Sequence, residues 1–209
     1  AAAGLNGLIL FKALVVTTSF ALVFFSFFKK ESIFIGSLFA LISIFILAER
    51  TDVRPEIFSF LFLSWYIFVL FRENSKLMWT LPAIQFLWVN THIYFFLGPL
   101  LFLLFFIGKL SRKEILNWWQ SRLFLAGLFI GAVNFVNPFF LKGAIYPLLV
   151  LKDYALPIVE NKSPFIYRQF MEFPLAYTFL IVGGVVAILG LIINYKNFSK
   201  NIYGLLEYL

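Results

Sequence analysis

Long apolar runs separated by short charged loops constrain this chain more than any other feature of its sequence. Residues 5–28, 57–71 and 174–195 each contain at most one charged residue. Hydrophobic residues make up 62% of the chain and charged residues 13%, about half the charged share of a typical globular domain. Because so much apolar surface is stable only next to lipid, the sequence predicts an all-α polytopic transmembrane helix bundle in a lipid bilayer.

The apolar pattern predicts about six to eight membrane segments, some of them short or broken, in a single domain over residues 1–209. The expected segments are 5–28, 33–48, 57–71, 77–110, 123–136, 139–151 and 174–195. The segment at 139–151 contains Lys142, Gly143 and Pro147, so it is interpreted as interfacial or re-entrant. The chain ends within an apolar pattern, and we expect it to be an internal piece of a longer membrane protein.

The longest apolar stretch, Leu77–Leu110, has the polar tripeptide Asn90-Thr91-His92 near its middle. As one helix it would be roughly 50 Å long, whereas the hydrocarbon core is only ~30 Å thick. It either tilts and protrudes or breaks near Asn90–His92 into two short arms. Two passes would place ten basic and three acidic residues on one side of the membrane and a balanced set on the other. This asymmetry favours the break and makes the basic side cytoplasmic.

The counts of cysteine and histidine exclude several kinds of chemistry. Cysteine is absent, which excludes disulfides, thiol catalysis and cysteine-based metal sites. With a single histidine there is no His/Cys cluster, so no structural zinc site is expected. The net charge of +7 comes from short loops between spans, where it sets orientation, so it does not indicate nucleic-acid binding.

Several polar residues are expected to gather near span ends on the extracytoplasmic side. They are Asp52, Arg54, Glu56, Asn90, His92, Asn137 and Glu160. Polar groups at membrane depth are costly and tend to face a cavity or a partner. Arg54 could bind a phosphate through two hydrogen bonds, and His92 could donate to a phosphate or act as an acid or base. The acidic members could hold a divalent metal or deprotonate an acceptor hydroxyl.

The same residues also have structural interpretations. Arg54-Pro55-Glu56 suits the start of a helix, because proline needs no N–H in the first turn. Asn90 and His92 could satisfy backbone groups that a helix interruption leaves free. Asn137-Pro138 is typical of a helix stop. The sequence leaves these alternatives open.

Three of these stretches resemble motifs of bacterial polytopic glycosyltransferases of the GT-C type. The stretches are RPEIFSFLFL (54–63), LPAIQFLWVNTHIYFFLGPLL (81–101) and NPFFLKGAIYPLLVL (137–151), followed by Glu160-Asn161. In that family, a helix start with Arg-Pro-Glu or Arg-Pro-Gln precedes a Trp-x-Asn-x-His element and then an Asn-Pro segment. The resemblance extends over most of residues 5–173. Two small residues commonly follow the histidine in that family, whereas Ile93 and Tyr94 follow it here.

The resemblance implies an inverting glycosyltransferase in the inner (plasma) membrane, with an extracytoplasmic active site. Its donor would be a polyprenyl-phosphate sugar and its acceptor a lipid, a glycan or a protein. Substrate-binding residues carried over are Arg54, Glu56, Asn90, His92 and Asn137, with Glu160 in the later loop. The family keeps a catalytic acid in its first extracytoplasmic loop, and no acid precedes Glu31. We therefore expect that acid outside this sequence, with Asp52 and His92 as the catalytic candidates within it.

Two other functions fit the same features. A transporter or lipid flippase also uses broken helices and polar groups at membrane depth. The gathering of polar residues on one side of the membrane and the lack of a visible internal repeat both count against a transporter or flippase. A non-catalytic membrane subunit would use Asn90 and His92 only to hold helices together.

Overall fold

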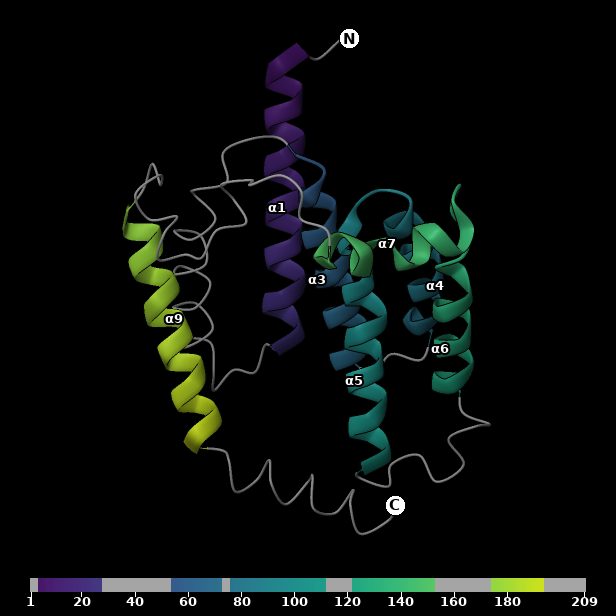
Figure 1. Cartoon of the computed structure of the whole chain (residues 1–209). Coiled ribbons are helices and arrows are strands. Elements are labelled where there is room, and N and C mark those ends of the chain that lie inside the picture. The colour runs from purple at the N-terminus through teal and green to yellow at the C-terminus, as the bar shows by residue number, and fades with distance from the viewer. Residues whose placement is uncertain (1–3, 28–53, 73–75, 112–121, 153–173, 194–209) are drawn as a thin grey trace. The chain divides into compact units, whose positions relative to one another are not determined.

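The computed structural model describes residues 4–27, 54–72, 76–111, 122–152 and 174–193. In these ranges the chain is helical and contains no strand, which confirms the all-α prediction. The α-helices are α1 (Gly4–Phe27), α3 (Glu56–Arg72), α4 (Thr80–Val89), α5 (Leu97–Ser111), α6 (Arg122–Val133), α7 (Phe140–Lys152) and α9 (Pro174–Ile193) (Figure 1). Two 3-10 turns, η2 (Leu77–Trp79) and η3 (Ile93–Phe96), precede α4 and α5. The expected segment at 33–48 lies outside the described residues.

The chain divides into two compact units. The first contains residues 1–27 and 53–152, and therefore α1 and α3 to α7. The described part of the second unit is α9, whose bounds lie close to the predicted segment 174–195. Because two compact units can belong to one membrane domain, the single domain over 1–209 stays a prediction.

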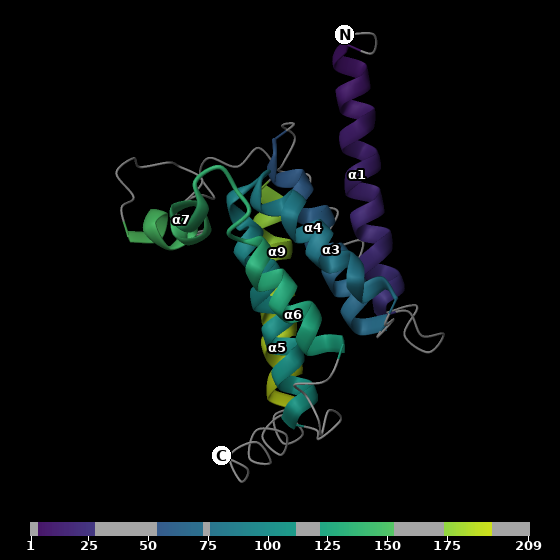
Figure 2. The same cartoon turned by 90° about the vertical axis from the view of Figure 1, so that its right-hand side faces the viewer.

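In the first unit, α1 and α3 pack side by side in parallel (Figure 2). Near their beginnings, the ring centroids of Phe11 and Phe58 are 6.0 Å apart. Near their ends, Arg72 Nη2 donates to the carbonyl oxygen of Phe25 at 2.9 Å. The end of α1 and the beginning of α3 therefore lie at opposite ends of this pair.

The helices after α3 alternate in direction. Trp65 of α3 donates through Nε1 to Thr80 Oγ1 at the beginning of α4, at 2.7 Å. An earlier turn of α3 contacts the end of α4, so these two helices are antiparallel. The rings of Phe106 and Phe124 are 6.5 Å apart where α5 ends and α6 begins, so this pair is antiparallel too. Helix α7 then runs across the direction of α5 and α6 (Figures 1 and 2). That orientation is expected of the predicted interfacial segment.

This alternation separates the charged residues of the first unit into two ends. The ends of α3 and α5 and the beginning of α6 lie at one end, with the basic residues Arg72, Lys76, Lys109 and Arg122. The beginning of α3, the turn after α4 and the end of α6 lie at the other end. The described candidate site residues are all at this second end. Among the described residues, these four basic residues therefore lie at the end opposite the candidate site residues, as the charge pattern predicted.

The apolar stretch 77–110 is broken where its length and the loop charges predicted. Helix α4 ends at Val89, and His92 has an extended backbone with φ −152° and ψ 145°. The turn η3 then leads into α5. The prediction of two short arms that meet at Asn90–His92 is confirmed.

One buried amide connects the helices of the first unit. Gln85 of α4 has no exposed surface. Its Oε1 accepts a hydrogen bond from the Tyr66 hydroxyl at 2.9 Å. Its Nε2 donates to the carbonyl oxygen of Phe95 at 3.1 Å and to Asn134 Oδ1 at 2.7 Å. Both amide hydrogens and the oxygen are thus paired, which avoids a cost of about 1–3 kcal/mol for each unpaired buried group.

Within the described residues, two stretches are long and apolar enough to cross a membrane, Gly4–Ser26 and Ile93–Leu110. Only 11% and 17% of these windows are buried, unlike the core helix of a soluble domain. They indicate membrane association. Other apolar helices are shorter: α6 has 12 residues and would rise about 18 Å, less than a ~30 Å hydrocarbon core.

The end of the predicted segment 123–136 was wrong, because α6 ends at Val133. The backbone N–H groups of residues 134, 135 and 136 donate to carbonyls three residues earlier, as in a 3-10 turn. Asn134 Nδ2 also donates to the carbonyl oxygen of Ile130 at 2.7 Å. Tighter turns and side-chain competition of this kind end an α-helix before its apolar pattern ends.

We expect Gly98→Ala to destabilise the first unit, because a Cβ at Gly98 would overlap with Gln85 Oε1 and lie 3.1 Å from Tyr66 Cζ. The loss should be about 1–3 kcal/mol, as for other overpacked cores. The matched control is Gly108→Ala in the same helix, where a Cβ would meet nothing within 4 Å. Reversible unfolding in detergent micelles measures both. Equal effects of the two substitutions would contradict the packing described.

Candidate functional site

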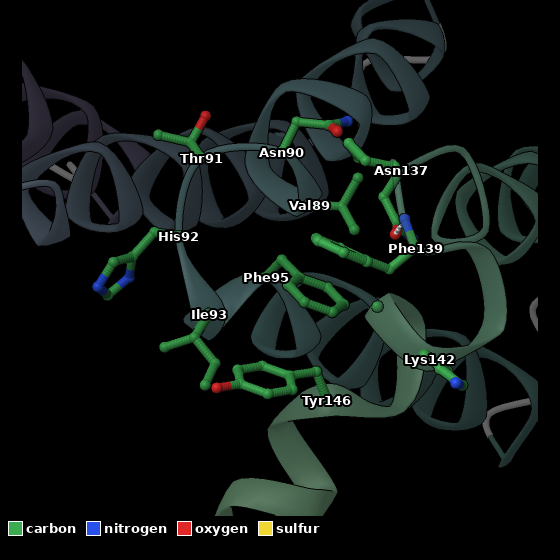
Figure 3. A pocket seen from close by; sticks show the side chains of 12 residues that line it. Val89, Asn90, Thr91, His92, Ile93, Phe95, Asn137, Phe139, Lys142 and Tyr146 are labelled. Atoms are coloured by element: carbon green, nitrogen blue, oxygen red, sulfur yellow. Dashed lines mark hydrogen bonds between the residues drawn. The ribbon is translucent and has the colours of Figure 1, made fainter.

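A cleft of about 630 Å³ lies at the end of the first unit opposite Arg72, Lys76, Lys109 and Arg122 (Figure 3). Its walls come from the turn between α4 and η3, the connection between α6 and α7, and the first turns of α7. Three residues predicted from the sequence, Asn90, His92 and Asn137, line this cleft together. Lys142 and Tyr146 also line it and were not predicted as site residues. Their spacing of four on one helix was the signal that could have paired them.

The interior of the cleft is apolar and its rim is polar. Figure 3 shows the side chains of Val89, Phe95 and Phe139 turned toward the middle of the cleft. The polar groups of Thr91, His92 and Lys142 point away from it, toward the rim. Apolar walls with a few polar groups that orient the ligand are typical of small-molecule sites.

His92 is held by side chains from two helices. Its Nδ1 lies 2.8 Å from Ser59 Oγ in α3, and the same oxygen accepts a hydrogen bond from Trp88 Nε1 at 2.8 Å. The ring of Tyr94 packs edge-on against the imidazole, with centroids 4.8 Å apart. The side chain is half-buried. The histidine of the Trp-x-Asn-x-His element is therefore fixed by the tryptophan of the same element.

The environment of His92 changes its pKa. The residue lies in the turn between α4 and η3, outside the helices. Partial burial lowers the pKa of His92 below its ordinary value, and the Glu56 carboxylate opposes this change. His92 is therefore neutral near pH 7, where it can donate one hydrogen bond and accept another.

Arg54 and Glu56 lie at the beginning of α3, at the same end of the unit as the cleft. Phe58 N donates to the carbonyl oxygen of Pro55 at 3.1 Å, which places this proline in the first turn as predicted. The Glu56 carboxylate is close enough to act on the pKa of His92. Neither Arg54 nor Glu56 lines the cleft. Their predicted contact with substrate stays a prediction.

The amide of Asn90 completes the broken helix. Its Nδ2 donates to the carbonyl oxygen of Phe86 at 2.8 Å and to that of Val136 at 3.1 Å. Thr91 Oγ1 likewise donates to the carbonyl oxygen of Leu87 at 2.5 Å. These bonds satisfy carbonyls at the end of α4 and tie that end to the connection after α6. These bonds show the structural role that was one of the two interpretations of Asn90. Substrate binding by Asn90 stays a prediction.

Asn137 organises the turn that begins α7. Its Nδ2 donates to the carbonyl oxygens of Asn134 and Phe140 at 2.8 and 2.9 Å, and its Oδ1 accepts from Phe139 N at 2.8 Å. Gly143 packs on this amide, because a Cβ there would overlap with Asn137 Oδ1. Phe140 has φ +48°, a left-handed conformation that costs about 1–2 kcal/mol for a residue with a Cβ. Asn137 thus helps to hold the strained turn that shapes one wall of the cleft.

Two predicted residues, Asp52 and Glu160, lie outside the described residues, and their roles stay predictions. Within the described ranges, no group of three or more His, Cys, Asp or Glu residues could hold a metal ion. No family model, curated protein or solved structure matches this chain.

We expect the stability that depends on His92 to decrease in mild acid. Because burial places its folded-state pKa below the ordinary value of about 6.5, the unfolded chain binds a proton first as the pH falls. The contribution is complete above about pH 6.5 and is lost as the pH falls toward the lowered pKa.

The measurement is the free energy of unfolding of the wild type and of His92→Gln at about pH 8 and about pH 5. The advantage of the wild type should be smaller at the lower pH. As the chain has one histidine, no other imidazole contributes to this difference. An advantage that grows as the pH falls would show that the folded-state pKa of His92 is raised.

Proposed function

We propose that this protein is a membrane-embedded glycosyltransferase of the GT-C type. It would contain about six to eight membrane segments and lie in a bacterial inner (plasma) membrane, with the cleft on the extracytoplasmic side. It would transfer a sugar from a polyprenyl-phosphate donor to a lipid, glycan or protein acceptor. The observation that supports this proposal most is the meeting of the Trp-x-Asn-x-His turn and the Asn-Pro turn in one cleft, at the end opposite Arg72, Lys76, Lys109 and Arg122.

The chemistry of the cleft suits a phosphate with an apolar chain. Val89, Phe95 and Phe139 provide apolar walls that isoprenoid carbons can contact. His92 can donate a hydrogen bond from a neutral ring, and Lys142 brings an ammonium group to the rim. Each of these groups could donate to a phosphate oxygen at its own part of the rim, since charged and neutral N–H donors are the usual partners of phosphate oxygens.

In the proposed reaction, the acceptor hydroxyl attacks the anomeric carbon of the sugar while the bond from that carbon to the phosphate oxygen breaks. The proton of the hydroxyl passes to a carboxylate, for which Asp52 and an acid upstream of this sequence are the candidates. Arg54 and Lys142 stabilise the negative charge that develops on the leaving phosphate, and His92 donates a hydrogen bond to it. Asn90 and Asn137 hold the two turns in place, and Glu160 belongs to the loop over the site.

We expect the Lys142→Gln and His92→Gln variants to bind a radiolabelled polyprenyl-phosphate sugar about tenfold more weakly, because each loses one hydrogen bond to a charged oxygen. Arg54→Gln should lose at least as much. The matched control is Lys76→Gln, at the opposite end of the first unit, which should bind like the wild type. Binding is measured on the intact protein in lipid nanodiscs.

Three results would contradict the proposal. Wild-type binding by the Arg54 and His92 variants would remove their roles. Movement of the labelled lipid across a vesicle membrane without sugar transfer would identify a flippase or transporter. Lower stability of His92→Gln with unchanged binding would identify a non-catalytic subunit.

A further inference from the structure

We propose that Ser59 is a positioning residue that holds the ring proton of His92 on Nε2, and that this N–H is the group His92 offers to an anionic ligand at the edge of the cleft. Ser59 lies in α3, outside the three elements that form the cleft. The position of the proton on the neutral ring is inferred from the hydrogen bonds alone. The role of the ring toward a ligand rests on the proposed function.

The indole of Trp88 determines one of the bonds of Ser59. An indole N–H donates and cannot accept, so Ser59 Oγ accepts the hydrogen bond from Trp88 Nε1 at 2.8 Å. Ser59 retains one hydroxyl proton, which needs an acceptor because the side chain is 4% exposed. The question is which atom accepts it.

Other serines of α1 and α3 show the usual acceptor of a serine hydroxyl proton in a helix. Ser19, Ser26 and Ser64 each donate to the carbonyl oxygen four residues earlier, at 2.6–2.8 Å. The carbonyl four residues before Ser59 is that of Pro55, and Ser59 Oγ does not donate to it in the described part of the chain. The partners of Ser59 Oγ in the described residues are instead Trp88 Nε1 and His92 Nδ1.

It follows that the Ser59 hydroxyl donates to His92 Nδ1 at 2.8 Å. If Nδ1 carried the proton, the buried Ser59 oxygen would accept twice and its own proton would have no acceptor. Such an unpaired buried group costs about 1–3 kcal/mol. The neutral imidazole therefore carries its proton on Nε2.

With its proton on Nε2, the neutral His92 ring can take fewer roles toward a ligand. Its Nδ1 lone pair is occupied by Ser59, and Nε2 is protonated, so the neutral ring has no free lone pair with which to act as a base. Within the described ranges, Nε2 makes no hydrogen bond. The groups that face the ring are Ser59, Tyr94 and, by its charge, Glu56. His92 is thus a hydrogen-bond donor to a ligand oxygen and is not the base that activates an acceptor.

The test uses ¹⁵N NMR of the intact protein, labelled at histidine and carried in nanodiscs with a tag that contains no histidine. Because His92 is the only histidine of the sequence, one pair of ring-nitrogen signals reports on it. Above about pH 7, we expect an acceptor-type signal for Nδ1 and a donor-type signal for Nε2. A donor-type Nδ1 in the wild type would overturn the proposal without any variant.

Three variants examine the role of Ser59. Ser59→Ala should shift the two nitrogens toward a mixture of tautomers, and Ser59→Thr, which keeps the hydroxyl, should restore the wild-type pattern. The matched control is Ser64→Ala in the same helix, which loses only a bond to the backbone and should leave the signals unchanged. A wild-type pattern in Ser59→Ala would overturn the proposal, as would an equal change in Ser64→Ala.

The ligand is examined separately with a short-chain prenyl phosphate. Its addition should move the Nε2 signal of the wild type more than the Nδ1 signal, and Ser59→Ala should bind it about tenfold more weakly. If the expected tautomer is found without any response of the ring to the prenyl phosphate, the proposed function and the ligand role of His92 are contradicted. That result would still establish that the ring proton lies on Nε2. A response at Nδ1 alone would overturn the assignment of Nε2 as the donor.

Discussion

The first unit depends on the buried amide of Gln85. This side chain receives a hydrogen bond from α3 and donates to η3 and to the end of α6, so one residue of α4 fixes three neighbouring segments. Between helices in lipid there is little hydrophobic driving force, so close packing and hydrogen bonds of this kind hold them together. Gly98 allows the close approach of α5 that encloses the amide. The position of the cleft follows from this arrangement, because Phe95 and Asn134 border the two turns that form it.

The break at Asn90–His92 is stable because its freed backbone groups find partners. Asn90 and Thr91 cap carbonyls at the end of α4, and Gln85 pairs with the carbonyl of Phe95 just after the break. In a bilayer, an interrupted helix is tolerated only where such partners exist or where a cavity supplies water. The break therefore turns one overlong stretch into two antiparallel arms and leaves a polar turn at the mouth of an apolar cleft.

The sequence predicted those parts of the fold that depend on length, charge and local chemistry. The break in 77–110 followed from the thickness of a bilayer and the distribution of bases, and the helix start after Pro55 followed from the geometry of proline. The sequence could not predict the early end of α6, because an apolar pattern continues through a 3-10 turn as well as through a helix. It also missed Gln85, which looked like one more residue of an apolar run.

The sequence predicted only the part of the candidate site that local chemistry reveals. Asn90, His92 and Asn137 stood out as polar residues in apolar surroundings, and the structure brings them to one cleft. Lys142 and Tyr146 did not stand out, because their place in the site depends on the strained turn at Phe140 that sets the direction of α7. Ser59 could not be identified at all from its position in α3. Its contact with His92 joins residues 33 positions apart, and no pattern of spacing along one helix encodes such a contact.

For Asn90, Asn137 and His92, structural and functional interpretations compete in different ways. Asn137 uses both the oxygen and the nitrogen of its amide within its own turn, and Asn90 uses its nitrogen twice on backbone carbonyls. A ligand that bound these atoms would have to break bonds that hold the cleft together. His92 differs, because its structural bond uses Nδ1 and leaves the other ring nitrogen to a ligand. The two interpretations of His92 are therefore compatible, and the bond that fixes its ring also determines which nitrogen is left to donate.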